Sequence, residues 1–166
     1  MGRTVQLSLP LDSILAATPS CVSMGMVGIA LNGVAVYNAL DDAERDAAAH
    51  EVQDRCDGHP QGSGEYHYHG PGSCQSEVHR LVHTLTGYAM DGFGLFGLYG
   101  DQGQEITNAE LDECHGHTHR IQWNGSEVET YHYHLTNAYP YTVSCLRGSE
   151  FIQSRPAGGG PPPPRR

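Results

Sequence analysis

Two copies of one ordered series of short motifs lie along the chain, and this repeat constrains the fold more than any other feature. The first series comprises 28–37, 54–59, the Tyr-His-Tyr-His string 66–69, and Cys74. The second series comprises, in the same order, 87–96, 112–117, the Tyr-His-Tyr-His string 131–134, and Cys145. Because four chemically different blocks recur in one order at nearly constant separation, we interpret the chain as two pseudo-repeated halves.

Each copy carries the signal of a β-hairpin. Asn32-Gly33 and Asp91-Gly92 each separate two apolar runs, which is typical of a two-residue turn. Short helices are predicted over 41–53, from its capping aspartates and alanines, and over 107–110, from a capping box. The predicted fold class is α+β, with mainly antiparallel β hairpins, short helices and two pseudo-repeated halves.

One duplicated domain with two extensions is the predicted organisation. Residues 1–25 are read as an N-terminal lead-in in which 4–10 alternates like a strand. The duplicated domain is predicted over 26–153, with halves at about 26–75 and 86–148 joined by a linking helix at 76–85. The Pro-, Gly- and Arg-rich tail 154–166 is expected to be disordered or to form polyproline II.

The second Tyr-His-Tyr-His string is predicted to present both histidines on one face, because alternate residues of a strand share a face. Asn124-Gly125 precedes the string and indicates another two-residue hairpin turn. The register set by this turn places His117 opposite His132, and His115 opposite His134. Directly opposed side chains lie on the same face about 5 Å apart, so these imidazoles are expected to converge.

The first string allows the same arrangement with a shorter hairpin, because a turn at 62–64 places His59 opposite His67. Three imidazoles with an open fourth position are typical of catalytic zinc, and imidazole suits copper equally. The alternative is a solvated histidine face with the tyrosines in the core. The predicted metal ligands are His59, His67, His69, His117, His132 and His134, with His115 and His119 as further ligands or orienting groups.

The other histidines are given no ligand role. His79 and His83 are spaced four residues apart on the predicted linking helix, have no counterpart in the repeat, and are expected to be exposed. His50 also stands alone.

Composition narrows the classes of partner. The 166 residues carry a formal net charge of −10, and the 11 histidines outnumber the 9 lysines and arginines. This acidity argues against nucleic acid and anionic membranes, and it is compatible with binding cations. No run approaches the roughly 20 apolar residues that a membrane span requires. A metal ion is therefore the predicted partner, and the sequence identifies no protein partner.

Two interpretations of the cysteines compete. Cys56 and Cys114 are equivalent in the repeat, as are Cys74 and Cys145, so disulfides 56–74 and 114–145 would each bracket one histidine string in an oxidising compartment. Alternatively, the Cys-x-x-His at 56–59 and its counterpart bind zinc in a reducing cytosol. We favour the disulfides, because the sequence lacks the paired Cys-x-x-Cys of a zinc ribbon. Cys21 is left over.

These motifs together resemble the YHYH domain family, which takes its name from the tetrapeptide. The resemblance covers roughly residues 26–148 and rests on the blocks 28–33, 56–59, 66–70, 87–92, 111–117, 131–134 and 139–141. It implies a secreted or surface protein, and therefore disulfides, but no established reaction. The N-terminus does not read as a secretory signal, which leaves a cytoplasmic location as the alternative.

Three functions are compatible with these features. The first is a metal-binding protein without chemistry of its own, with copper preferred to zinc, in an extracellular setting. The second is a metalloenzyme that uses the same histidines, either a copper oxidoreductase or a zinc hydrolase. The third is a structural or adhesion module in which the histidines only pack. Calcium is disfavoured, because 101–105 lacks the alternating carboxylates of an EF-hand loop.

Overall fold

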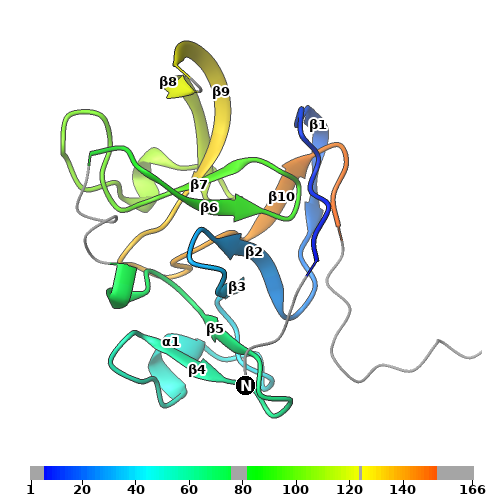
Figure 1. The fold of residues 1–166 in the computed structure, drawn as a ribbon, viewed down its shortest axis with the longest axis vertical. Helices are drawn as coiled ribbons and strands as arrows, with labels where there is room; N and C mark the ends of the chain where they lie inside the picture. Colours follow the sequence, from blue (N-terminus) through cyan, green and yellow to red (C-terminus); the bar gives the residue numbers. More distant parts are fainter. Residues whose placement is uncertain (1–5, 76–81, 124, 153–166) are drawn as a thin grey trace, which may run out of the picture.

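The computed structural model describes residues 6–75, 82–123 and 125–152, which form β-strands joined by loops and a few short helices (Figure 1). In chain order the elements are β1 (Leu15–Cys21), β2 (Met26–Ala30), β3 (Ala35–Tyr37), α1 (Ala47–His50), β4 (Gly58–Pro60), β5 (Tyr66–Tyr68), the 3-10 helix η1 (Ser73–Gln75), β6 (Leu85–Ala89), β7 (Gly94–Phe96), the 3-10 helix η2 (Asn108–Glu110), β8 (Gly116–Trp123), β9 (Ser126–His134) and β10 (Cys145–Gly148).

Eight of the strands form one sheet in the order β4-β5-β3-β2-β6-β7-β9-β8, and β1 pairs with β10 in a separate two-stranded sheet. Strands β2 and β6 lie side by side at the centre of this sheet, with hairpin β8–β9 at one edge and hairpin β4–β5 at the other (Figure 1). Pairing is antiparallel except between β3 and β5 and between β7 and β9. The predicted mainly antiparallel sheet with short helices is confirmed.

The hairpins predicted at Asn32-Gly33 and Asp91-Gly92 are both present, but each turn has three residues rather than two. The Ala30 N–H donates to the Val34 carbonyl and the Ala89 N–H to the Phe93 carbonyl, both at 2.9 Å, which leaves 31–33 and 90–92 as the loops. The turn side chains of Asn32 and Asp91 accept hydrogen bonds from the backbone N–H two residues later, at 3.1 and 3.3 Å. Gly33 and Gly92 follow them with φ of +84° and +83°, which a side chain would disfavour. These local interactions produce the hairpins β2–β3 and β6–β7.

The helix predicted over 41–53 is shorter than expected. Asp41 accepts hydrogen bonds from the backbone N–H groups of Ala43 and Arg45, both at 2.9 Å, and thereby forms a turn where the helix was expected to begin. Helix α1 starts only after its N-cap Asp46, and the backbone is already extended at Glu51. Local side-chain hydrogen bonding therefore overrides the helix propensity of the alanines.

Two other predicted elements also differ. The linking helix 76–85 falls partly on residues 76–81, which lie outside the described residues; beyond them, 82 and 83 form a turn and β6 begins at Leu85. The predicted strand 4–10 is irregular over its described residues 6–10, and β1 starts only at Leu15. The tail from 153 onward lies outside the described residues.

The buried core lies on the tyrosine side of the histidine strings. Tyr131 and Tyr133 belong to the apolar core cluster, where they pack edge-on against Phe93 with ring centroids 5.3 and 6.5 Å away. Because side chains alternate along β9, the intervening His132 faces the opposite side of the sheet. Burial of the tyrosine rings therefore determines which side of the sheet receives the histidines.

The first tyrosine of each string is bound by an aspartate that precedes the neighbouring strand. The Tyr66 hydroxyl donates to Asp54 at 2.8 Å, and the Tyr131 hydroxyl donates to Asp112 at 3.0 Å. Each aspartate also accepts backbone N–H groups of its own loop, including that of the cysteine two residues later. The hydroxyls therefore tie the histidine strands to the loops that lead into β4 and β8.

The second tyrosine of each string reaches a turn of the central hairpins. The Asn32 amide donates to the Tyr68 hydroxyl at 3.2 Å, and the Tyr133 hydroxyl donates to Asp91 at 2.6 Å. Asp91 is fully buried and also accepts the backbone N–H of Gly148 at 2.8 Å. This carboxylate therefore connects β9, the β6–β7 turn and β10.

Both predicted disulfides are present, between Cys56 and Cys74 and between Cys114 and Cys145. Cys21 is exposed and free. The disulfides join each histidine hairpin to the segment that follows it, and they exclude these cysteines as zinc ligands.

Glycine is required immediately before the first histidine of β8. A Cβ on Gly116 would overlap the Tyr131 ring and would lie 2.6 Å from the carbonyl oxygen of His132. We expect Gly116→Ala to lower the free energy of unfolding by about 2 kcal/mol, measured by urea denaturation, because the two strands must separate to admit the methyl group.

The matched control is Gly62→Ala in the β4–β5 turn, where a Cβ meets no atom within 4 Å. Its stability should change by less than about 0.5 kcal/mol. Equal effects of the two substitutions would contradict the packing argument.

Candidate metal centres

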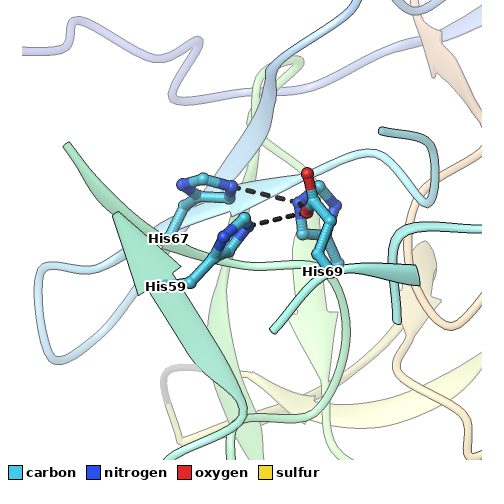
Figure 2. Close-up of side chains that lie close together, drawn as sticks. His59, His67 and His69 are labelled. Atoms are coloured by element: carbon cyan, nitrogen blue, oxygen red, sulfur yellow. Dashed lines mark hydrogen bonds and ion pairs between the residues drawn. The ribbon is translucent and has the colours of Figure 1, made fainter. Parts of the chain in front are cut away.

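Hairpin β4–β5 brings the first group of histidines together. His59 pairs directly with His67, as predicted from the turn length, and His69 follows at the end of β5. Figure 2 shows the three rings converging, with Nε2 of His67 and Nε2 of His69 only 3.0 Å apart. We call these three residues together with Glu51 the first cluster.

Backbone carbonyls determine the orientation of two of these rings. Nδ1 of His67 contacts the carbonyl oxygen of Glu65 at 3.2 Å, and Nδ1 of His69 contacts that of Asn38 at 2.6 Å. A carbonyl only accepts hydrogen bonds, so each Nδ1 carries the proton and each Nε2 keeps its lone pair. This is the arrangement in which histidine binds metal through Nε2.

A carboxylate completes the first cluster. One oxygen of Glu51 lies 2.7 Å from Nε2 of His59 and 3.1 Å from Nε2 of His69. The four side chains offer donor atoms that all lie within 4.8 Å of one another. The early end of α1 makes this possible, because the extended backbone at Glu51 directs its carboxylate toward the hairpin.

Two histidines of the first cluster, His67 and His69, are buried and have pKa values below the ordinary range of histidine. Burial lowers the pKa of His67 to about 4, and burial also lowers the pKa of His69. Tyr37 stacks on the His67 ring with centroids 3.9 Å apart and shields one face of it. Two neutral imidazoles thus direct lone pairs at each other across 3.0 Å, an arrangement that a cation between them would stabilise.

The first cluster opens onto a cavity of about 670 Å³. The cavity is lined by the four residues of the first cluster and by other polar and apolar side chains, the apolar ones including Met24, Met26, Leu40, Met90 and Ile152. An ion held by the first cluster would therefore be accessible to small molecules.

Hairpin β8–β9 assembles the second group at the opposite edge of the sheet. His117 pairs directly with His132, as predicted, and their Nε2 atoms are 3.1 Å apart. His119 lies two residues along the same strand, and its ring centroid is 4.7 Å from that of His132. His134 is fully buried, and its Nε2 has no hydrogen-bond partner among the described residues.

Backbone carbonyls also orient the rings of the second group. Nδ1 of His117, His132 and His134 contacts the carbonyl oxygens of residues 110, 130 and 97 at 3.2, 3.2 and 2.8 Å. Each Nε2 is therefore left to face the cluster with its lone pair. Burial lowers the pKa of His134 to about 3 and that of His132 to about 2, so both rings are neutral near pH 7 and available to bind a cation.

His83 was predicted to be an exposed helix residue, and this is wrong. Its backbone adopts a φ of +41° in the turn before β6, and its side chain is only 7% exposed. The ring stacks on Phe96 with centroids 4.5 Å apart and places Nε2 3.2 Å from Nε2 of His132. The repeat gives no signal for this residue, because His83 has no counterpart in the first series.

Asp101 was likewise not predicted to lie near the histidines. Its two carboxylate oxygens lie 3.3 Å from Nδ1 of His83 and 3.1 Å from Nε2 of His119. We call the six residues that meet here the second cluster: His83, Asp101, His117, His119, His132 and His134.

His115, by contrast, does not join the second cluster. Its φ of +76° ends the strand geometry before the predicted pair with His134 can form, and β8 begins at Gly116. Its Nδ1 donates to the carbonyl oxygen of His134 at 2.9 Å, and its Nε2 contacts the Thr136 hydroxyl at 3.1 Å. His50 is exposed on α1, and His79 lies outside the described residues.

The fold and the clusters define a mostly antiparallel β protein with several groups of histidines that can hold a metal ion. A family model described as YHYH protein matches residues 6–109, so the chain belongs to the YHYH protein family. The match contains the whole first cluster and ends before the second Tyr-His-Tyr-His string. No curated protein and no solved structure matches the chain.

None of the helices in the described part of the chain has the length and apolar character needed to traverse a bilayer.

The lowered histidine pKa values predict acid sensitivity of the metal-free protein. Buried His67 and His134 have pKa values of about 4 and about 3 in the folded state. The unfolded chain, in which histidine titrates near 6.5, therefore binds protons more readily, and stability falls as pH drops below that value. Each such histidine should lower the free energy of unfolding by about 1 kcal/mol for each pH unit between about pH 6 and 5.

Urea denaturation in the presence of a chelator at pH 7.5 and 5.0 measures this effect. Asp41 should not contribute in this window, because its hydrogen bond with the Arg45 side chain lowers its pKa to about 2. A free energy of unfolding that is the same at both pH values would show that the histidines are not buried in the neutral state.

Proposed function

We propose that this protein binds transition-metal ions, at least one in each histidine cluster, through imidazole Nε2 atoms. The observation that carries the proposal is the facing of Nε2 atoms at 3.0 Å in the first cluster and 3.1 Å in the second, while the Nδ1 atoms of those rings contact backbone carbonyls. A hydrogen bond between two such nitrogens needs a proton that neutral rings do not supply. A metal ion satisfies both lone pairs at once.

The donor spacing also agrees with a metal polyhedron. Ligands about 2.0 Å from a tetrahedral ion lie about 3.3 Å from one another. Within the first cluster, the Nε2 and carboxylate oxygen atoms are 2.7, 3.0 and 3.1 Å apart. A small expansion of the cluster on binding is sufficient to reach the ideal spacing.

Copper is the preferred ion in this proposal, with zinc second. Both clusters offer imidazole and carboxylate donors, which suit both ions, and the cysteines of the hairpins are joined in disulfides. For a given set of such ligands, Cu²⁺ binds more tightly than Zn²⁺. Copper should therefore displace zinc from both clusters in a competition experiment.

An extracellular setting is proposed for this activity, because disulfides persist in oxidising compartments. We further propose that the binding unit is a duplicated domain, with one histidine hairpin in each half. The strand order supports duplication, since β3, β5 and β4 on one side of the β2–β6 pair correspond to β7, β9 and β8 on the other.

A metalloenzyme is the second candidate, and the cavity of about 670 Å³ beside the first cluster favours it. An ion bound there would have a side open to small molecules, as a copper oxidoreductase or a zinc hydrolase requires. Water bound to such an ion can have a pKa near 7. Access of an exogenous ligand such as azide to the copper-loaded protein, followed by visible absorption, would support this candidate.

Histidine substitutions test the binding proposal. After chelator treatment and equilibrium dialysis against Cu²⁺ or Zn²⁺, elemental analysis should find at least one ion per cluster. His69→Ala should weaken metal binding by the first cluster, and His134→Ala should weaken binding of the ion that faces His132 and His134 in the second. Each substitution should lower the metal affinity of its site by more than about 100-fold, because loss of a residue that only supports a ligand already lowers metal affinity 10- to 100-fold.

His50→Ala is the matched control, because His50 is exposed on α1 and belongs to neither cluster. Its metal content should equal that of the unmodified chain. A reconstituted unmodified chain without bound transition metal would overturn the proposal, as would an equal loss in the His50 variant.

A further inference from the structure

The second cluster contains more donor atoms than a single ion can use. Five histidines and Asp101 meet there, whereas the first cluster has three histidines and one carboxylate. Copper and zinc bound to imidazoles usually take four or five ligands. The surplus indicates that the second cluster differs from the first in the number of ions that it holds.

Only some histidines offer both ring nitrogens. Nδ1 is occupied by a backbone carbonyl in His67, His69, His117, His132 and His134, so each of these rings can bind one ion only. His83 is different, because its Nδ1 faces Asp101 at 3.3 Å and its Nε2 faces His132 at 3.2 Å. The stacking of His83 on Phe96 holds the ring in this position between the two groups.

The two nitrogens of His83 face two sets of ligands, which adjoin at His119, because His119 also lies within reach of His117 and His132. On the Nε2 side lie His132 and His134, whose Nε2 atoms are oriented by carbonyls. On the Nδ1 side lie Asp101 and His119, joined by a 3.1 Å contact between the carboxylate and Nε2. Each set, with one nitrogen of His83, has its donor atoms within 4.8 Å of one another.

We infer that the second cluster is a binuclear centre in which His83 bridges two divalent metal ions. The inner ion is held by His83 Nε2, His132 and His134, with His117 beside them, and the outer ion by His83 Nδ1, Asp101 and His119. Binding of the second ion displaces the remaining N–H proton of His83, which passes to solvent, so that the ring bridges as an imidazolate. This inference rests on the proposed metal-binding function.

Asp101→Asn in the full chain tests the bridge with little risk to folding, because the Asp101 side chain is 54% exposed. Loaded with Cu²⁺, the unmodified chain should bind about three ions, and Asp101→Asn about two, because the amide weakens the outer site. Asp12→Asn, which changes an exposed carboxylate outside both clusters, should still bind about three.

Electron paramagnetic resonance supplies the second readout. Two Cu²⁺ ions joined by an imidazolate couple magnetically, so the unmodified chain should show fewer spins than bound copper ions. Asp101→Asn should restore one spin for each ion bound, and Asp12→Asn should not.

The outcomes separate the two proposals. About one ion in each cluster, with full spin count, would overturn the binuclear centre and leave metal binding intact. Three ions without magnetic coupling would overturn the bridging role of His83. No bound transition metal would overturn both.

Discussion

The hydrogen bonds of four tyrosine hydroxyls are the constraint on which the clusters depend. Each hydroxyl is bound to a side chain at a turn or loop, and the shortest contact is the 2.6 Å bond from Tyr133 to buried Asp91. Leaving such a group without its partner in the core costs about 1–3 kcal/mol, so a shift of one residue in β5 or β9 is strongly disfavoured. Since side chains alternate, a strand held by its tyrosines must direct its histidines to the other face.

Each alternating string therefore performs two tasks at once. On one face, the tyrosines join the core and fix the register of the sheet; on the other, the histidines are gathered with their Nδ1 atoms bound to carbonyls. Gathering neutral imidazoles whose lone pairs converge carries an electrostatic cost, and burial keeps His132 in the neutral form by lowering its pKa. The tyrosine hydrogen bonds and the disulfides offset this cost, and a bound cation would remove it.

Local features of the sequence were sufficient to predict part of this arrangement. The pairs His59–His67 and His117–His132 follow from turn length and from alternation, which depend on neighbouring residues only. The positions of Glu51, His83 and Asp101 depend instead on how loops pack against the sheet. Their contacts with the histidine hairpins are long-range, and neither hydrophobic periodicity nor the repeat carries information about them.

The asymmetry between the clusters follows from those same loops. The two hairpins supply similar histidines, but the segment before β6 adds His83 and the loop after β7 adds Asp101 in the second cluster. In the first cluster the segment after α1 adds only Glu51, and the cluster borders a cavity. Where the loops fill the space with donors, the site is suited to holding more metal. Where they leave it open, the same histidines face small molecules, and chemistry at a bound ion would be confined to that side.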